Sequence, residues 1–466
     1  MALSMISENQ NAGHSAIDEN VIHKYNRPAP RYTSYPTALK FCTIDDDESR
    51  EAMCLDAADD NPMSLYFHLP FCQSLCWFCG CTKIISTNQS LADTYIGYLE
   101  KEIALVRPHL GDERNVVQIH FGGGTPNFLD PEQIDRLGKA IRAAFNVDNK
   151  AEISVEIDPR TLTEDKVEAF RQFGVNRASI GVQDVNPDVQ KAIHRIQSSD
   201  MNRQAIDWLR KAGIEELNED LIYGLPNQSV DSFSETLKEV ISYDPDRFAL
   251  FSYAHVPWGQ PAQRILEKRV LPSAEEKIAM LVHSVNHFLG AGYHHIGMDH
   301  FTKPGDPLAV AQRKKTLQRN FQGYSLFKDT QICGFGMSAI SQTHRTYRQN
   351  FKELDTYYEY LDADRSPVEK GYLMSAEDQL RRQIIMHLMC DMELDYDSLN
   401  EELDIDFKDR FQAELSNMRK LESDGLVELR SNGISITVLG RLLVRNIARV
   451  FDAYAKSEEK RFSKAV

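Results

Sequence analysis

Short apolar runs alternate with amphipathic stretches along the central part of the chain. The runs typical of buried strands cover residues 64–69, 116–121, 153–158, 177–183, 216–223 and 247–254. The stretches between them repeat apolar residues at a period near 3.6 and predict helices at 91–106, 131–145, 164–173, 201–212 and 229–242. This alternation predicts a parallel sheet with right-handed crossovers. Because six units are fewer than the eight of a closed barrel, we expect an α/β fold with a partial (β/α)6 barrel.

Polar residues and glycines recur where the predicted strands end. The sequence Gly-Gly-Gly-Thr-Pro at 122–126 follows the second strand, Glu156 and Asp158 end the third, Gln183 ends the fourth, and Asp220 lies in the fifth. A single acid at a strand end is more often a helix cap or an ion-pair partner, and three glycines can form a simple turn. Their recurrence at the same end of successive units predicts one shared site at the mouth of the barrel.

The loop after the first predicted strand contains four of the chain's eight cysteines. Cys72, Cys76 and Cys79 have the spacing CxxxCxxC, and Cys81 follows two residues later. Three closely spaced thiolates can hold three corners of an iron–sulfur cube and leave the fourth iron open to another ligand. A zinc site, which usually has two separated pairs of ligands, and a set of inert buried thiols are the alternatives. A disulfide framework is typical of short secreted chains, which this one does not resemble.

Composition limits the partners. The net charge is -16, with 69 acidic and 53 basic residues, which disfavours nucleic acid and anionic membranes as main partners. An anionic substrate would therefore need a locally basic pocket. No apolar stretch approaches the 18 or so residues of a membrane span, and residues 1–20 lack the pattern of a secretory leader. We expect a soluble, cytoplasmic protein.

The chain from about residue 371 has a different pattern. Helical stretches at 377–390 and 407–424 precede a hairpin that turns at Asn432 and Gly433, and a last helix starts at Gly440. This order indicates a mostly helical, winged-helix-like domain. Residues 371–466 hold 14 basic and 18 acidic side chains, which favours a structural cap over a DNA-binding role. We expect a segment over the barrel mouth (1–55), the barrel (56–300), an extension (301–370) and this C-terminal domain (371–466).

The cysteine loop, with Phe78 before its third cysteine, resembles the signature of radical S-adenosylmethionine enzymes. The rest of the chain resembles, more narrowly, the oxygen-independent coproporphyrinogen III oxidases. The segments that carry this resemblance are 66–71, Cys81, 122–126, 181–184, 220–226 and 253–257, together with 24–26, 30–37, 297–301 and 319–324 outside the barrel. One local departure is the sequence Trp-Gly-Gln-Pro at 258–261, where the family has a more aliphatic or aromatic stretch.

The resemblance implies a role in haem biosynthesis. In that reaction two propionates of coproporphyrinogen III become the vinyl groups of protoporphyrinogen IX, with loss of CO2 and without oxygen. A 4Fe-4S cluster on Cys72, Cys76 and Cys79 would reduce S-adenosylmethionine to methionine and a 5′-deoxyadenosyl radical, which takes a hydrogen atom from the propionate. The resemblance also implies an electron donor of the flavodoxin or ferredoxin type, and we expect a monomer.

The family's binding residues can be placed on this sequence one by one. For a first S-adenosylmethionine the matching positions are Tyr66, Phe78, Gly123, Glu156 and Ile340, and for a second they are Gly124, Thr125, Gln183, Arg195, Asp220 and Ala254. Phe78 could equally be a packing aromatic. Arg195 suits a carboxylate because its guanidinium is permanently charged and forked, although a surface ion pair is the simpler interpretation. Cys81 is not a cluster ligand in the family and is either packed or beside the first cofactor.

The four propionates of the substrate call for cations or hydrogen-bond donors. Arg31 and Lys24 are candidates if the N-terminal segment covers the barrel opening, and Tyr32 and Tyr35 could belong to such a lid. The pair 299–300, Asp-His, could relay protons or could be structural. Two other functions remain open: a non-catalytic haem-carrier relative, which typically lacks Cys81 and the segment 30–36, and a radical enzyme of other specificity.

Overall fold

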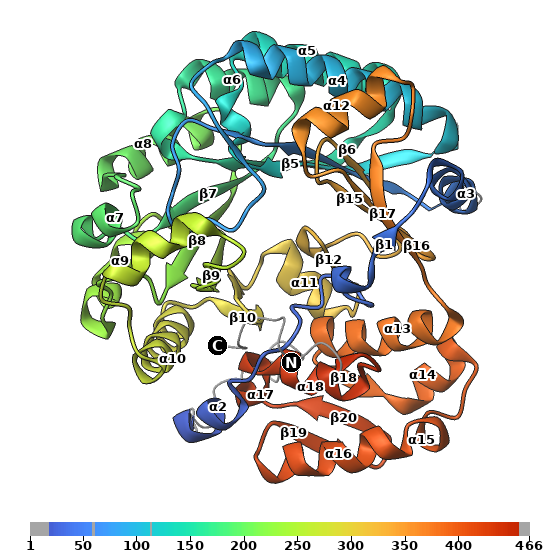
Figure 1. Ribbon diagram of the computed structural model, residues 1–466. Helices are drawn as coiled ribbons and strands as arrows, with labels where there is room; N and C mark the ends of the chain where they lie inside the picture. Colours follow the sequence, from blue (N-terminus) through green and yellow to red (C-terminus); the bar gives the residue numbers. More distant parts are fainter. Residues whose placement is uncertain (1–17, 58–60, 112–113, 456–466) are drawn as a thin grey trace.

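The computed structural model describes residues 18–57, 61–111 and 114–455. Within these ranges thirteen strands form one sheet in the order β1-β17-β16-β15-β14-β2-β5-β6-β7-β8-β9-β11-β10. The strands from β14 to β9 run parallel, and antiparallel strands flank them on both sides. Figure 1 shows an incomplete ring of strands with helices on its outer side. The expected α/β fold with a partial, open barrel is confirmed.

Each of the six predicted runs falls on a parallel strand, although β6 and β9 end at residues 157 and 252, before the predicted ends at 158 and 254. Their bounds are β2 Met63–Leu69, β5 Asn115–Gly123, β6 Asn146–Ile157, β7 Arg177–Gln183, β8 Glu216–Tyr223, β9 Arg247–Ser252 and the additional β14 Gln331–Phe335. The helices of the barrel are α4 Ser90–Val106, α5 Pro131–Ala144, α6 Glu164–Phe173, α7 Pro187–Ala192, α8 Ser199–Lys211, α9 Val230–Ile241 and α10 Ala274–Gly290. The prediction missed the first part of β6, which is polar and mostly exposed, α7, which is only six residues long, and the helix α10.

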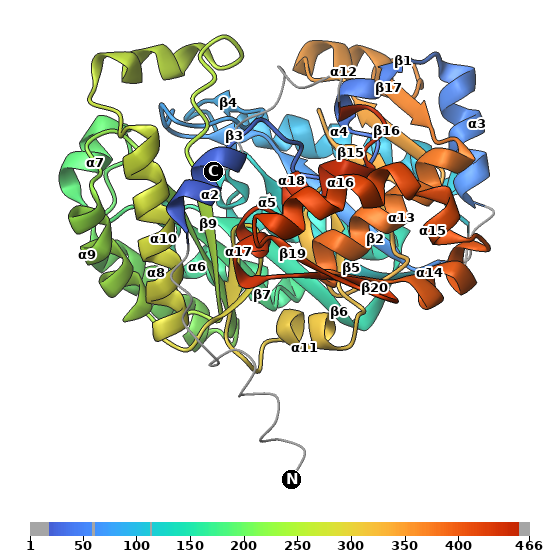
Figure 2. The ribbon, with the colours of Figure 1, turned by 90° about the horizontal axis from the view of Figure 1, so that it is seen from below.

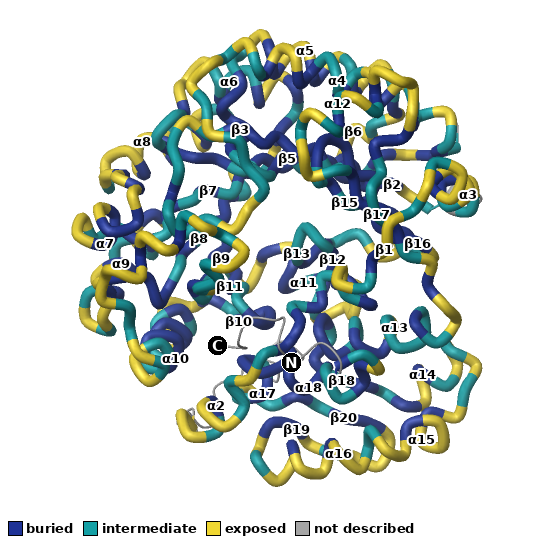
Figure 3. Tube along the Cα trace, in the orientation of Figure 1, coloured by how far each residue is buried: buried dark blue, intermediate teal, exposed yellow. Residues whose placement is uncertain are grey.

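Alternation along the strands separates a core face from a lumen face. Phe335, Phe67 and Phe121 stack across β14, β2 and β5, with ring centroids 5.1 and 5.5 Å apart, and Phe173 of α6 covers Phe121 at 5.5 Å. Figure 3 shows the strands as the buried layer inside a ring of helices with exposed outer surfaces. Residues next to these phenylalanines, such as Tyr66, point to the opposite side and reach the lumen.

A second set of elements extends the sheet beyond β14. These are β15 Ile340–Gln342, β16 Thr346–Asn350, β17 Val368–Leu373, β1 Cys42–Thr43, and the helices α3 Asp46–Ala57 and α12 Leu354–Asp362. On the other side lie β10 His294–Gly297, β11 His300–Thr302 and α11 Pro307–Arg313. Short pairs are formed by β3 Phe71–Cys72 with β4 Ile84–Ile85 and by β12 Gln318–Asn320 with β13 Gly323–Ser325. The N-terminal helix α2 is Glu19–Tyr25.

The C-terminal part packs several helices on a small antiparallel sheet. Its elements are α13 Ala376–Cys390, β18 Glu393–Asp395, α14 Tyr396–Leu403, α15 Phe407–Arg410, α16 Gln412–Ser423, β19 Val427–Arg430, β20 Gly433–Ile436, α17 Val438–Leu442 and α18 Val444–Ala448. The predicted hairpin is present, and β18 adds a third strand to it. The predicted helix at 407–424 is divided, because Phe411 has non-helical φ and ψ angles of −114° and 32°. Among the described residues, no helix has the length and apolar character needed to cross a membrane.

Candidate active site

Contacts from distant segments fix the cysteine loop. The backbone N–H of Trp77 donates to the carbonyl of Ile193 at 3.0 Å, just after α7, and the amide of Gln263 donates to the carbonyl of Phe78 at 2.9 Å. Gln260 donates in the same way to the carbonyl of Gly80 at 3.0 Å. Gln260 and Gln263 belong to the segment that connects β9 to α10, and Figure 2 shows this connecting segment beside β3 and β4. The loop therefore has a defined shape although it has little regular structure of its own.

The three cysteines of the CxxxCxxC motif face one cavity of about 310 Å³, here called the cysteine cavity. Most of the site residues expected from the sequence line it as well, contributed by the ends of successive parallel strands. They are Cys72, Cys76, Phe78, Cys79, Gly123, Gly124, Thr125, Glu156, Gln183, Arg195 and Asp220. The structure thus gathers at one place residues that lie up to 148 positions apart in the chain.

A neighbouring cavity of about 320 Å³, here called the tyrosine cavity, is lined by Tyr66 and Ile340. It shares Cys81, Gly123 and Glu156 with the cysteine cavity. Ala254 lines neither cavity and is exposed just after the end of β9. Phe78, expected beside Tyr66, instead lines the cysteine cavity with the residues of the second expected set.

The thiols influence one another's protonation. Burial raises the pKa of Cys72 to about 11, the hydroxyl of Thr125 lowers it by donating to the sulfur at 3.3 Å, and the charges of Cys79 and Cys76 raise it. A hydrogen bond with Cys81 lowers the pKa of Cys79, and the same bond raises the pKa of Cys81. A bound metal would favour the thiolate forms, because it replaces this mutual repulsion with attraction.

Two arginines lie against the buried Cys76. Arg160 and Arg195 place guanidinium nitrogens 3.4 and 3.6 Å from its sulfur. Both also pair with Asp158, at 2.6 and 3.1 Å. Burial raises the pKa of Asp158, but the charge of Arg195 and the contacts with Arg160 outweigh it, so the pKa lies below its usual value. Asp158, Arg160 and Arg195 therefore form a charged cluster in the wall of the cysteine cavity.

Glu156 joins the two cavities. It accepts a hydrogen bond from the backbone N–H of Gly123 at 3.1 Å, and Nε2 of His120 lies 3.5 Å from its other oxygen. Desolvation raises the pKa of Glu156. The hydrogen bond and charge of His120, together with the hydrogen bond from Gly123, outweigh this effect and lower the pKa below its usual value. His120 is also stacked on Tyr66, with ring centroids 5.8 Å apart. The carboxylate is therefore ionised and oriented, ready to accept further donors.

Gln183 and Asp220 come from the adjacent strands β7 and β8. Gln183 adopts a left-handed backbone (φ 68°) at a bulge in this pair of strands, a strained conformation that is common at functional sites. Asp220 accepts hydrogen bonds from Asn218 at 2.8 Å and Ser179 at 3.2 Å. Burial raises the pKa of Asp220 to about 7, and the charge of Glu156 adds to this, so near neutral pH the side chain can accept or donate.

The glycine loop requires glycine at two positions. Gly123 has a left-handed backbone (φ +112°), and a Cβ atom there would lie 2.5 Å from the ring of His68. At Gly124 a Cβ would overlap the backbone carbonyl of Pro70. The backbone N–H groups of Gly124 and Thr125 donate to the carbonyls of Leu69 and Phe71, both at 2.9 Å. The loop is therefore seated directly on the end of β2, beside the cysteine loop.

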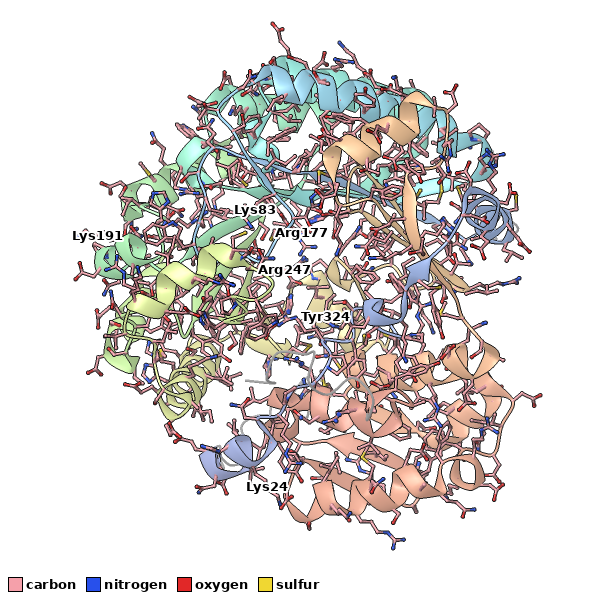
Figure 4. All side chains as sticks on the ribbon, viewed as in Figure 1. Lys24, Lys83, Arg177, Lys191, Arg247 and Tyr324 are labelled. Carbon is pink, nitrogen blue, oxygen red and sulfur yellow. The ribbon has the colours of Figure 1, made fainter. Side chains whose placement is uncertain are left out.

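The residues proposed to bind substrate carboxylates or to transfer protons lie in different places and have different partners. Lys24 pairs with Asp424 at 2.6 Å on the outer edge of the molecule, as Figure 4 shows, and lines none of the cavities described here. Arg31 pairs with Asp299. Burial lowers the pKa of His300 to about 3, with a further contribution from Arg319, so His300 is neutral and cannot carry a proton to Asp299 as a cation.

The tyrosines of the proposed lid fasten the N-terminal segment to the body of the protein. Tyr32 donates to Asp452 at 3.0 Å, and the backbone carbonyl of Tyr35 accepts from the hydroxyl of Tyr347 at 3.0 Å. Both side chains are buried and contribute packing rather than a polar surface.

Sequence reasoning missed His120 and Arg160. His120 lies in the apolar run 116–121, and only its position two residues before Gly122 places it on the lumen face. Arg160 follows Asp158 by two residues but has no motif of its own. Strand alternation was therefore the only signal available for His120, and the sequence offered none for Arg160.

The cysteine cavity fits a cluster with a bound nucleoside sulfonium compound. Nε of Arg195 is buried without a hydrogen-bond partner in the described part of the chain, and this residue lines the cavity, so a donor is available for an anionic group. The glycine loop leaves backbone exposed where a Cβ atom would collide. The described residues contain no group of three His, Cys, Asp or Glu side chains that could hold a metal ion by themselves.

Comparison with known proteins defines the class first. The family model of the radical SAM superfamily matches residues 66–240, which span the cysteine loop, the glycine loop and strands β2 to β8. A second model, the HemN C-terminal domain, matches residues 374–443. The partial barrel and its cysteine motif are therefore those of the radical SAM superfamily.

Full-length relatives narrow the assignment. The chain is 43% identical over 453 residues to the oxygen-independent coproporphyrinogen III oxidase of Synechocystis sp. (96% of this chain, 97% of the relative). It is also 43% identical over 451 residues to that of Escherichia coli K12 (96% and 98%). A solved structure of coproporphyrinogen III oxidase from Escherichia coli, described as a radical SAM enzyme, superimposes with a TM-score of 0.87 at 43% identity and covers 91% of this chain and 97% of its own. The chain belongs to the family of oxygen-independent coproporphyrinogen III oxidases.

Proposed function

We propose that this protein converts coproporphyrinogen III to protoporphyrinogen IX without oxygen, as an oxidoreductase of haem biosynthesis. Each of two propionates loses CO2, gives one hydrogen atom to a 5′-deoxyadenosyl radical and one electron to an external acceptor, and a vinyl group remains. The observation that carries the proposal is the convergence of three cysteines, a glycine loop and a buried arginine on one cavity of about 310 Å³. Membership in the family and coverage of nearly the whole chain support it.

Cys72, Cys76 and Cys79 would hold a 4Fe-4S cluster, and the surrounding residues would hold S-adenosylmethionine. When bound, the cluster and S-adenosylmethionine together supply a carbon radical strong enough to take hydrogen from an unactivated C–H bond. Glu156 is ionised and suits an ammonium or hydroxyl donor, and Arg195 suits a carboxylate. The protein's own contribution is to orient these groups and to keep water away from them.

We keep the second S-adenosylmethionine as part of the proposal. Two adjoining cavities that share Cys81, Gly123 and Glu156 support it, with Tyr66 and Ile340 in one and Gln183, Arg195 and Asp220 in the other. Phe78 is assigned to the cysteine cavity in this scheme. Ala254, which is exposed, would contact a ligand only through its backbone at the rim.

Several features of the cellular reaction remain part of the proposal. We infer a monomer in the cytoplasm that receives electrons from a carrier of the flavodoxin or ferredoxin type. We also retain the division into the N-terminal segment (1–55), barrel (56–300), extension (301–370) and C-terminal domain (371–466). The superfamily model at 66–240 and the C-terminal model at 374–443 each lie inside one of these segments, which supports the division.

An anaerobic assay with coproporphyrinogen III, S-adenosylmethionine and a chemical reductant tests the function. We expect CO2 and protoporphyrinogen IX, together with methionine and 5′-deoxyadenosine, from protein that contains about four irons per chain. Haem binding without turnover would indicate a carrier protein instead. Cleavage of S-adenosylmethionine without decarboxylation would indicate a radical enzyme of other specificity, and one zinc without iron would contradict the cluster.

A further inference from the structure

A third cavity, of about 450 Å³, lies between the N-terminal segment and strands β16 and β17. Its charged lining residues are Arg31, Lys352 and Lys370, and no Asp or Glu lines it. We call it the lysine cavity. This is unusual in a chain with a net charge of -16, in which acidic residues outnumber basic ones. We propose that the lysine cavity binds the carboxylates of the two propionates that do not react, an inference that rests on the proposed function.

The cavity has rigid walls. Lys370 of β17 is paired across the sheet with Gln349 of β16, and Lys352 follows β16 by two residues. On the opposite wall, Arg319 donates to the backbone carbonyl of Arg31 at 3.2 Å. Binding here would therefore not require the ordering of a loop, which preserves more of the interaction energy as affinity.

The aromatic residues at the base of the cavity lock the N-terminal segment to β16. Phe41 stacks on Tyr347 with ring centroids 5.2 Å apart, and Phe321 meets Tyr347 edge to face at 6.1 Å. The hydroxyl of Tyr347 also donates to the backbone carbonyl of Tyr35 at 3.0 Å. The lysine cavity therefore belongs to the folded body and is a permanent feature of the surface.

The charges of the cavity are not fully compensated. None of the described residues forms an ion pair with the exposed Lys352, whereas Lys370 is 3.3 Å from Glu369, which does not line the cavity. Arg31 pairs with Asp299, which does not line it either. Thr33 and Ser34, whose side chains are neutral hydroxyls, also line it. A cavity lined by ammonium groups and hydroxyls suits carboxylates, because each carboxylate oxygen accepts several hydrogen bonds.

The location of the cavity explains which carboxylates it would hold. Phe321 lines both the lysine cavity and the tyrosine cavity, and the tyrosine cavity in turn shares Cys81, Gly123 and Glu156 with the cysteine cavity. The three cavities therefore form a row, with the lysine cavity at the end away from the cysteines. A macrocycle that places one propionate beside a nucleoside bound in the tyrosine cavity would extend its other side toward Lys352 and Lys370.

Binding of two stable porphyrins to the anaerobically reconstituted enzyme tests the proposal. Coproporphyrin III carries all four propionates, and mesoporphyrin IX carries only the two that do not react. We expect the double variant Lys352→Gln/Lys370→Gln to bind both porphyrins about tenfold more weakly, measured by quenching of porphyrin fluorescence. The matched control is Lys191→Gln/Lys314→Gln. Lys191 also lies 3.3 Å from a nearby carboxylate, that of Asp188, and lies on the outer surface in Figure 4.

The outcomes separate the possible explanations. Equal weakening of both porphyrins by the double variant, with the control unchanged, supports the proposal, as does a raised KM with little change in kcat. Weakening of coproporphyrin III alone would place the reacting propionates in this cavity and overturn it. Unchanged affinity for both would also overturn it. A wild-type enzyme that binds both porphyrins but fails to decarboxylate coproporphyrinogen III would refute the proposed function and leave the binding site intact.

Discussion

One guanidinium nitrogen of Arg195 lies 3.6 Å from the sulfur of Cys76, and both side chains are buried. The same nitrogen donates to Asp158 at 3.1 Å, which fixes the arginine in place. A positive charge held beside a thiolate ligand stabilises the more negative, reduced state of an iron–sulfur cluster. The protein as a whole has a net charge of -16, so the positive charge of Arg195 opposes the negative potential of the rest of the molecule at this site.

The first prediction concerns this charge. Arg195→Met should lower the reduction potential of the cluster, whereas Arg195→Lys should retain most of the wild-type value because the charge remains. Asp158 keeps its contact with Arg160 at 2.6 Å in both variants, so the site should still assemble. The measurement is a redox titration followed by electron paramagnetic resonance, with iron content determined for each protein. Equal potentials in the two variants would show that the charge of Arg195 has no effect on the cluster.

The second prediction separates the cluster ligands from the fourth cysteine. Cys76→Ser should lose the cluster and all activity, because an alcohol is a much poorer iron ligand than a thiolate. Cys81→Ser should keep about four irons per chain, since the proposed cluster uses only the three cysteines of the motif. Iron and sulfide analysis with visible spectra checks both. A Cys81→Ser protein without iron would mean that the ligand set is wrong.

The third prediction uses two glycines with similar backbones and different surroundings. Gly123 (φ +112°) has the ring of His68 where a Cβ would lie, whereas Gly213 (φ +84°) has nothing within 4 Å. Gly213→Ala should cost about 1 kcal/mol of unfolding free energy from backbone strain alone. Gly123→Ala should cost clearly more, because the loop or the His68 ring must also shift. Urea unfolding of both variants measures the difference.

The same pair separates stability from binding. Gly123→Ala should weaken S-adenosylmethionine binding in calorimetry, since the glycine loop and Glu156 move together through their hydrogen bond of 3.1 Å. Gly213→Ala should bind normally. If both variants lose the same stability and neither binds S-adenosylmethionine more weakly, the close approach of His68 to Gly123 affects neither stability nor binding.

Strand positions and most site residues could be predicted because they depend on local patterns. The buried runs at 177–183 and 216–223 have the same bounds as β7 and β8, and the residues that follow parallel strands meet at one edge by geometry. For the same reason Cys72, Glu156 and Gln183 were expected at one mouth, and they line one cavity. Here a short-range pattern was enough to predict a long-range arrangement.

The parts that could not be predicted depend on contacts between distant segments. Strand β14 joins the sheet beside β2 although some 260 residues separate them, and nothing in its short apolar run indicates that partner. Lys24 was expected to contact substrate because it lies in a segment that resembles the family. It instead forms an ion pair with Asp424, which is far away in the sequence. The lysine cavity likewise combines residues 31, 352 and 370, whose proximity only the fold reveals.

The last prediction concerns Glu219 of β8, whose side chain is fully buried. Neither of its carboxylate oxygens has a hydrogen-bond partner in the part of the chain that the structure describes. Burial raises the pKa of Glu219 well above its usual value, against a small opposing effect of Arg210. The folded state therefore keeps a proton that the unfolded chain, with a pKa of about 4.3, has already lost. Stability must then fall as the pH rises above about 4.3, by up to about 1.4 kcal/mol per pH unit, until the folded pKa is reached.

Glu219→Gln removes this titration and should gain stability relative to the wild type as the pH rises from 5.5 to 7.5. The exposed neighbour Glu215 supplies the control, and Glu215→Gln should show no such trend. Thermal unfolding midpoints of the three proteins at several pH values give the comparison. Because a buried glutamine also lacks partners, the slope with pH is the decisive quantity and the absolute midpoint is not. Parallel curves for Glu219→Gln and the wild type would show that Glu219 is ionised and paired in the folded protein.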